Sequence, residues 1–491
     1  MTNGDAPETA VRRDRFSGGP AREFLSSLAA DERIFAADLA VDRAHVVMLA
    51  EQGIVEGGVA GEILAALADV EAAGHGALPD GEDVHEAIET AVIDRVGPDG
   101  GKMHTARSRN DEVATCIRYR LRGDLLDAAA ATVTLREALV ETAREHVETV
   151  MPGYTHLQPA QPITVAHWIL SYESAVARDT ARLLDAYDRT NRSPLGAAAF
   201  AGTPFDVDRD RTAALLGFDG TVRNSMDAAA SRDFLAEAAS ALATHATTLS
   251  GLAEDVIIYA NKGLVELDDD YSSTSSIMPQ KKNPDTLELV RGVAGDAVGE
   301  VSGTLTALKG LPRAYNRDLQ RVHPGVFEAA DAVTEATRVA AGAVATADWN
   351  DEALAAAAGE GFSTATGVAD LLAMAGLPFR TAHEIVAAAA EAVEDGMDPA
   401  TAAAKVDEAA AEVLGESVFA YVSRQDVEDA LDPAHSVASR DSAGGPAPAA
   451  VAEELSAAGD AVEADAAAVD AHRDALAEAA DALEAEVADY V

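Results

Sequence analysis

The amino-acid sequence predicts an all-α protein built around long helices. Apolar residues make up 48% of the 491 residues but aromatic residues only 4%, so small side chains must supply much of the core. Alanine, the commonest residue, is also the best helix former. Runs that alternate β-branched and polar residues, which would indicate strands, are scarce. At roughly 100–200 residues per domain, this length predicts about two to four domains.

The expected helices follow the 3.6-residue spacing of apolar side chains. Residues 21–73 are helical with short breaks, most clearly at 36–52, and the Gly/Pro/Asp-rich segment 97–101 marks a loop. The longest amphipathic stretches lie in the middle of the chain and predict an elongated bundle. They cover 124–150, 167–190, 227–254 and 287–308, and another follows Pro324.

Beyond about residue 360 the predicted helices are shorter and richer in alanine and acid. A Gly/Pro-rich loop at 444–448 leads into a last helix at about 450–490. The exposed positions of that helix are almost all acidic, which is typical of a solvated helix face.

The chain carries a large excess of acid. Lys plus Arg is 37 and Asp plus Glu is 84, which gives a net charge of −47. A field of this sign repels phosphates and anionic lipid, so we expect neither nucleic acid nor a membrane as a partner. Because the acids are spread along the chain and lysine is depleted, the composition indicates adaptation to high salt, which screens self-repulsion. The alternative, an acidic interaction tail, would place the acids in one block.

The cysteine content and the chain start indicate the compartment. Cys116 is the single cysteine, so no intrachain disulfide can form, as expected in a reducing cytoplasm. The first residues lack the basic-then-apolar pattern of a signal peptide. No apolar run approaches the roughly 20 residues of a spanning helix. The sequence therefore predicts a soluble, cytoplasmic protein.

A run of hydroxyl residues marks the first candidate site. Residues 272–276 read Ser-Ser-Thr-Ser-Ser, and Ile-Met-Pro-Gln-Lys-Lys-Asn-Pro follows at 277–284. Hydroxyl groups compete with the backbone for hydrogen bonds, which predicts a mobile loop leading into a helix near Asp285. Adjacent lysines in a chain that nearly avoids lysine suit an anionic ligand such as a carboxylate. A flexible linker is the alternative on these residues alone.

Three further segments carry polar groups near predicted helix ends. Residues 153–162 place Thr and His side by side in a Pro-rich turn, where the His is a candidate for proton transfer or a satisfied polar residue. Residues 104–111 combine two Arg with Ser and Asn, which suits carboxylate binding or a structural ion-pair network. Residues 315–320 are a weaker candidate.

Motifs that would indicate a cofactor or metal are missing from the sequence. No Walker A loop surrounds Lys102, no G-x-G-x-x-G is present, and His383-Glu384 lacks the second His of H-E-x-x-H. The sequence therefore predicts chemistry without metal or cofactor, carried out by Ser, His, Lys and carboxylates.

These segments, in this order, resemble those of the argininosuccinate lyases in the fumarase/aspartase superfamily. Residues 275–284 are similar to the superfamily signature S-S-x-M-P-x-K-x-N-P. Residues 153–162 and 104–111 match the subfamily patterns G-Y-T-H-L-Q-P-A-Q-P and H-T-x-R-S-R-N-D. Further matching segments are 224–227, 378–383 and 444–448, so the resemblance extends from about residue 15 to the end.

The resemblance implies a three-domain, fumarase/aspartase-like fold. Residues 1–106 would form an N-terminal helical domain whose first ~16 residues are loose, and residues 107–358 a central, long five-helix bundle with the signature loop at 270–285. Residues 359–491 would form a small C-terminal helical domain with the acidic terminal helix. Four chains would assemble into a homotetramer with a twenty-helix core, and each active site would take residues from three chains.

The implied activity is the reversible anti-elimination of argininosuccinate to arginine and fumarate, the last step of arginine synthesis. One alternative is another superfamily lyase, such as an adenylosuccinate lyase, and the residues around Lys281 argue against it. The other is an inactive, crystallin-like structural paralogue. An inactive paralogue should have lost an essential residue. The sequence retains Ser275, His156, Lys281 and Glu288.

The resemblance assigns the catalytic roles. Ser275 would be the base, acting as an alkoxide, which requires nearby donors to lower the pKa of its hydroxyl. Lys281 and Asn283 would supply those donors and stabilise the dianionic intermediate. His156 would be the acid, oriented by Glu288.

The remaining implied residues contact the substrate. They are Thr155, Ser108, Arg109 and Asn110 at its carboxylates, Ser27 and Asp31 at the arginine-side amino-acid group, and His85, Tyr315, Gln320 and His323 as further contacts.

Three positions depart from the family pattern. Thr274 stands where many members have Gly, residues 197–199 are all Ala, and His323 stands where many members have Lys, so the charge there is open.

Overall fold

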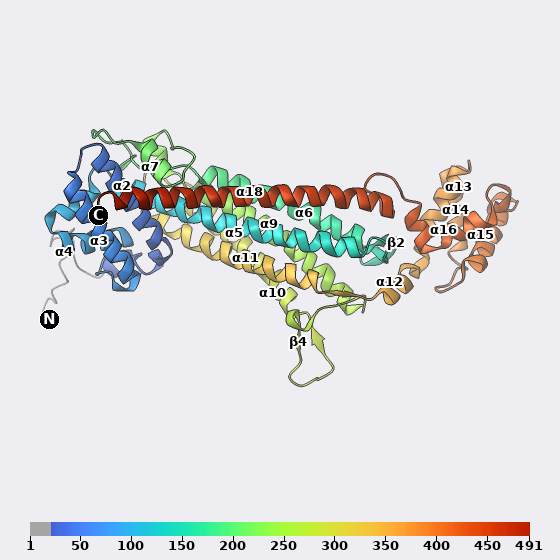
Figure 1. Cartoon of the computed structure of the whole chain (residues 1–491). Helices are drawn as coiled ribbons and strands as arrows, with labels where there is room; N and C mark the ends of the chain where they lie inside the picture. The colour runs from blue at the N-terminus through green and yellow to red at the C-terminus, as the bar shows by residue number, and fades with distance from the viewer. Residues whose placement is uncertain (1–20) are drawn as a thin grey trace.

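The computed structural model describes residues 21–491 and confirms the predicted all-α architecture (Figure 1). Five long helices of this part of the chain lie side by side in an elongated bundle. They are α5 (Arg109–Glu145), α6 (Val165–Thr190), α9 (Asp233–Asn261), α10 (Asp285–Leu308) and α11 (His323–Ala345). The sequence placed the start of the first one near residue 124. The helix begins earlier, at Arg109, because Ser108 and Asp111 form a capping box there.

The first helices pack against one end of the bundle (Figure 1). They are α1 (Ala21–Leu25), α2 (Phe35–Glu51), α3 (Gly57–Ala73) and α4 (Val84–Val96), and α2 confirms the helix expected at 36–52. Two short helices, α7 (Arg209–Leu215) and α8 (Ser225–Ala230), lie in the connection between α6 and α9. Buried side chains of α2, α3 and α4 share one apolar core with the adjoining part of the bundle.

The opposite end of the bundle carries a small helical cluster (Figure 1). Helix α12 (Asp351–Ala358) leads from the bundle into it. The cluster comprises α13 (Ala365–Met374), α14 (Phe379–Ala389), α15 (Pro399–Leu414), α16 (Arg424–Leu431) and α17 (Pro433–Ala438). Helices α13 to α16 surround a separate apolar core, so this cluster has its own packing unit.

Short strands and 3-10 turns connect these helices. The strands pair in three antiparallel ribbons within the described residues. The pairs are β1 (Val150–Thr155) with β2 (Gln158–Thr164), β3 (Val265–Glu266) with β6 (Asp348–Trp349), and β4 (Ser273–Thr274) with β5 (Lys282–Asn283). The 3-10 helices are η2 (Ala30–Ile34), η3 (His75–Ala77), η4 (Pro98–His104), η5 (Asp269–Tyr271), η6 (Arg317–Arg321), η7 (Glu360–Phe362) and η8 (Val418–Ala420).

The last helix, α18 (Pro448–Ala488), runs back along the bundle to the N-terminal end (Figure 1). Its buried side chains Val451, Leu455 and Val462 join the core of the bundle, and Leu483 joins the core at the N-terminal end. The sequence grouped this helix with the C-terminal domain, whereas its packing places it on the bundle. The other predicted domain limits remain predictions.

Across residues 21–491, none of the helices combines the length and apolar character that a membrane crossing requires.

Arg136 ties α18 to the middle of the bundle. Its buried Nε donates to Glu173 Oε1 of α6 at 2.8 Å, and its Nη1 pairs with Asp465 of α18. Glu173 is buried as well. Because a buried charge costs several kcal/mol unless it is paired, each member of this triad depends on the others.

Replacing Arg136 with Met should therefore lower the free energy of unfolding by about 3–5 kcal/mol, because Glu173 is left as an unpaired buried charge. Urea unfolding at constant, molar KCl measures this. The control is Arg144→Met, which removes a surface pair with Glu141 and should cost about 1 kcal/mol or less. Equal losses of unfolding free energy in the two variants would contradict the claim that Arg136 holds α18 against the bundle.

Candidate active site

A cavity of about 490 Å³, here called the N-terminal cavity, lies where the first helices meet the start of α5 and the segment before α11. It gathers eight of the nine residues that the sequence assigned to substrate binding alone. They are Ser27, Asp31, His85, Arg109, Asn110, Tyr315, Gln320 and His323. These residues come from stretches far apart in the sequence, so the tertiary fold creates the site.

The ninth residue, Ser108, holds the start of α5 instead of lining the cavity. Its Oγ accepts a hydrogen bond from the Asn110 backbone N–H at 3.3 Å, and Asp111 Oδ1 accepts one from the Ser108 N–H at 2.9 Å. The other oxygen of Asp111 accepts from two backbone N–H groups in segment 196–198. This capping fixes the first turn of α5, which carries Arg109 into the cavity wall.

Asp31 offers a carboxylate to the cavity. Its Oδ2 accepts hydrogen bonds from Ser27 Oγ at 2.7 Å and from the Val84 backbone N–H at 3.2 Å. Burial raises the pKa of Asp31, and the positive charge of His85 opposes that rise. A carboxylate placed beside Ser27 in this way suits the ammonium group of an amino acid.

The structure answers the question that the sequence left open at His323. Burial lowers the pKa of His323 to about 4, and the charge of Arg232 acts in the same direction. His323 is therefore a neutral imidazole at neutral pH. The buried Arg232 guanidinium and His85 are the cations whose charges act on His323.

Thr155 and His156 lie at the tip of the β1–β2 hairpin. Thr155 pairs with Gln158, so the turn consists of His156 and Leu157, which have φ of 56° and 59°. Two-residue turns of this kind usually contain Asn and Gly, because other side chains are strained at positive φ. The turn presents His156 to solvent beside a second cavity of about 430 Å³, which Tyr259 also lines.

Ser275 and Lys281 lie on a hairpin that projects from the bundle between β4 and β5 (Figure 1). Ser275 Oγ accepts hydrogen bonds from the backbone N–H groups of Met278 at 3.1 Å and Ile277 at 3.4 Å. Two donors aimed at one oxygen favour negative charge on it. The loop predicted here contains this short ribbon, and the helix expected near Asp285 is confirmed as α10.

The two lysines of this hairpin differ in their contacts. Lys282 Nζ pairs with Glu266 at 3.0 Å and Asp269 at 2.8 Å, and so holds the base of the hairpin. Lys281 is exposed, and the described part of the chain gives its ammonium group no ion pair. Lys281 is thus the lysine that remains available to a ligand.

The described chain does not bring the predicted catalytic residues together. Helix α5 has 37 residues and spans about 55 Å, with Arg109 at its first residue and the His156 hairpin beyond its end. The Ser275 hairpin projects at a third place (Figure 1). Glu288 lies exposed in the first turn of α10, and among residues 21–491 no hydrogen bond joins it to His156. The residues assigned from the sequence thus lie in three separate places: the N-terminal cavity, the His156 hairpin and the Ser275 hairpin with the start of α10.

Comparison with known proteins identifies the family. Residues 23–299 match the family described as Lyase, and residues 362–438 match the family described as Argininosuccinate lyase C-terminal. The argininosuccinate lyase of Haloarcula marismortui is 68% identical over 490 residues, which cover 99% of this chain and 97% of that protein. The chain belongs to the argininosuccinate lyase family.

Two further similarities agree with this assignment. The argininosuccinate lyase of Natronomonas pharaonis is 69% identical over 99% of this chain and 98% of that protein. Both relatives are haloarchaeal, as the acid excess predicts. A solved structure of an EDDS lyase variant with bound fumarate has a TM-score of 0.87 at 37% identity, and the match covers 96% of both chains.

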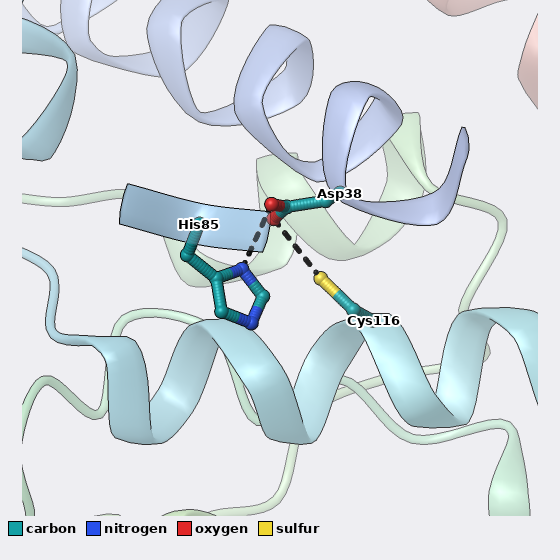
Figure 2. Close-up of side chains that lie close together, drawn as sticks. All are labelled: Asp38, His85 and Cys116. Atoms are coloured by element: carbon teal, nitrogen blue, oxygen red, sulfur yellow. Dashed lines mark hydrogen bonds and ion pairs between the residues drawn. The ribbon is translucent and has the colours of Figure 1, made fainter. Parts of the chain in front are cut away.

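Beneath the N-terminal cavity, this lyase holds a buried network of charged residues. His85 Nδ1 donates to Asp38 Oδ2 at 2.8 Å, and Cys116 Sγ donates to Asp38 Oδ1 at 3.3 Å (Figure 2). Glu112 lies 3.7 Å from the same His85 nitrogen. Burial lowers the pKa of His85, but the charges of Asp38 and Glu112 outweigh it and raise the pKa to about 10. His85 is therefore an imidazolium at neutral pH.

The spacing of Asp38, His85 and Cys116 would also suit a metal ion. A metal requires a deprotonated thiol and a neutral imidazole. Here burial and Asp38 raise the pKa of the Cys116 thiol, and His85 keeps its proton. In the structure these three residues are joined by hydrogen bonds in which the imidazole and the thiol donate to Asp38.

Motif reasoning missed several residues of this region. Glu82, Asp83, Asn316 and Arg317 line the N-terminal cavity, and Arg317 pairs with Glu82. Arg317 lies inside the weaker motif at 315–320 and could have been found there. Asp38 and Glu112 lie in the first turns of α2 and α5, where acidic residues are common, so nothing in their local sequence distinguishes them from other acids at a helix start.

The raised pKa of His85 predicts a pH-dependent contribution to stability. The stabilisation is complete below the unfolded-state pKa of about 6.5 and is lost as pH rises through the folded-state pKa of about 10. The difference in unfolding free energy between the wild type and His85→Gln should therefore shrink as pH rises from 7 to 10. Urea unfolding in molar KCl measures it. A difference that stays constant would show that His85 is not held as a cation.

Proposed function

We propose that this chain catalyses the reversible anti-elimination of argininosuccinate to L-arginine and fumarate, the last step of arginine biosynthesis. The observation that carries the proposal is similarity to argininosuccinate lyases along the whole chain. The geometry of the N-terminal cavity supports it. Acidic and basic groups line that cavity together, as the recognition of an amino-acid zwitterion requires.

Ser275 removes the proton from the succinyl Cβ. A serine hydroxyl is too weak an acid to do this unaided, so its oxyanion must be stabilised. The backbone N–H groups of Ile277 and Met278 point at Oγ in this structure, and Lys281 is free to add its charge. The carbanion is delocalised into the adjacent carboxylate as a dianion, which Lys281 and Asn283 stabilise.

His156 supplies the proton for the leaving nitrogen. As the C–N bond breaks, the guanidino nitrogen of the arginine half gains electron density, and protonation by a positioned imidazolium completes the elimination. The exposed tip of the hairpin is a place from which His156 can reach a substrate held elsewhere. Glu288 orients the ring, and Thr155 holds a substrate carboxylate.

The substrate is held by the N-terminal cavity. Ser27 and Asp31 bind the amino-acid group of the arginine half, and Tyr315 and Gln320 are further contacts. Arg109 and Asn110, presented by the first turn of α5, bind carboxylate oxygens, and Ser108 fixes that turn. The neutral His323 acts as a hydrogen-bonding group in place of a cation.

We further propose that four chains form a tetramer whose active sites are shared. Exposed apolar side chains on α10 support this. Leu289 is 72% exposed, and Val298 and Leu305 are each 52% exposed. Gly292, Gly295 and Gly299 lie in the same helix, where a Cβ would meet no neighbouring atom. Glycine in a helix interior costs about 1 kcal/mol relative to alanine, so its repeated use suits close packing of a helix from another copy.

Replacing Ser275 with Ala should lower turnover by roughly 10³-fold or more, because the base is lost while the fold is kept. Fumarate absorbance in concentrated KCl measures the rate, with argininosuccinate and adenylosuccinate offered in parallel. The control is Ser276→Ala, the exposed neighbour on the same hairpin. Near-normal turnover in Ser275→Ala would remove Ser275 as the base, and fumarate from adenylosuccinate alone would favour the alternative lyase.

A further inference from the structure

His85 lines the N-terminal cavity with one ring nitrogen bound and the other unused. The residue is 5% exposed, and Nδ1 is engaged by Asp38 and Glu112. The buried Nε2 has no hydrogen-bond partner among residues 21–491. A buried N–H group without an acceptor is costly, so this nitrogen points to an acceptor that the chain itself does not supply.

The surrounding charges fix the orientation and the charge of the ring. Cys116 occupies Asp38 Oδ1, which leaves Oδ2 for His85. The groups that face this network are Asp38 and Asp42 from α2, Glu112 and Cys116 from α5, Arg107 before α5, Asp83 before α4, and Asp31 from η2. Arg107 contacts Asp42 at 2.6 Å and Glu112 at 2.9 Å. With Arg107 so engaged, the carboxylate of Asp38 is directed at Nδ1 of His85.

Other positive groups of the cavity are engaged by carboxylates. Arg109 lies 3.3 Å from Asp83, and Arg317 pairs with Glu82. His323 is neutral. The His85 ring, which lines the cavity, is therefore a cation whose second ring N–H is buried and unpaired within the described chain.

We propose that His85 binds a carboxylate group of the substrate through Nε2–H, and that Asp38 is the positioning residue that holds the ring for this contact. This inference rests on the proposed function, which supplies ligands with carboxylates in both halves. The carboxylate belongs either to the amino-acid group of the arginine half or to the succinyl half. Both candidate groups are carboxylates with the same chemistry, and the calorimetric titration described next distinguishes them.

Calorimetric titration of the assembled protein in concentrated KCl tests the contact. The ligands are arginine against argininamide and fumarate against its monoamide, so that each pair differs in one carboxylate. His85→Gln should bind one of the two acids about 10- to 100-fold more weakly than the wild type, as expected for a lost charged hydrogen bond. Its affinity for the matching amide should stay unchanged. The acid that loses affinity identifies the carboxylate.

The other outcomes overturn the inference in distinguishable ways. If the wild type binds neither arginine nor fumarate, the proposed function and the inference fail together. If the wild type binds them and His85→Gln keeps the preference for acid over amide, the inference fails alone. An equal loss for acid and amide shows a purely structural role and also overturns it.

Asp38→Asn tests the positioning role through pH. With its main counter-charge removed, the imidazolium should lose its proton within the neutral range, so affinity for the acid should fall about 10-fold or more between pH 6 and 9. The wild type should show no such fall, because the pKa of His85 is about 10. Cys116→Ser, which keeps a donor to the other oxygen of Asp38, is the control and should match the wild type. If the affinity of Asp38→Asn does not depend on pH, the positioning role of Asp38 is overturned. If that variant does not assemble, the His85→Gln titrations decide whether His85 binds the carboxylate.

Discussion

The length of α5 is the constraint on which the rest of the structure depends. A continuous helix of 37 residues keeps its first turn and the hairpin that follows its end about 55 Å apart. The capping box at Ser108 fixes one end, and the buried Arg136 triad fixes the middle. Such a rod cannot fold back to bring Arg109 to His156. A reaction that uses both residues must therefore draw them from different copies of the chain, which is the basis of the shared-site proposal.

Charge is distributed differently on the surface and inside. The surface accounts for most of the −47 net charge, which concentrated salt screens. Inside, carboxylates are matched to specific cations, as in the contacts of Arg107 and His85 with buried acids. Buried charges of this kind are weakly affected by salt, because solvent ions cannot enter. A salt-adapted exterior can thus coexist with an N-terminal cavity whose charges are set by the fold.

The sequence predicted the helical bundle well because amphipathic spacing determines which face of a helix is buried. It misplaced the start of α5 near residue 124, whereas the helix begins at the cap formed by Ser108. It could not show that α18 returns along the bundle, because an acidic, alanine-rich helix carries too little apolar pattern to indicate its partner.

The site was predicted unevenly for similar physical reasons. Arg109, inside a contiguous motif, was assigned from the sequence and lines the N-terminal cavity, whereas the assignment of Ser275 stays a prediction. Asp38 and Glu112 were not assigned, because they meet His85 only through tertiary packing. The neutral state of His323 also depends on burial and on Arg232, neither of which is visible in its local sequence.

The most direct test of a shared active site is activity in mixed assemblies of two inactive variants. Ser275→Ala and His156→Asn would each be purified, dissociated at low salt, mixed in equal amounts and reassembled in concentrated KCl. If each site takes Ser275 and His156 from different chains, random mixing should restore about one quarter of wild-type fumarate release. If the mixture stays as inactive as its components although mixed assemblies form, both residues act from one chain and the shared-site account is contradicted.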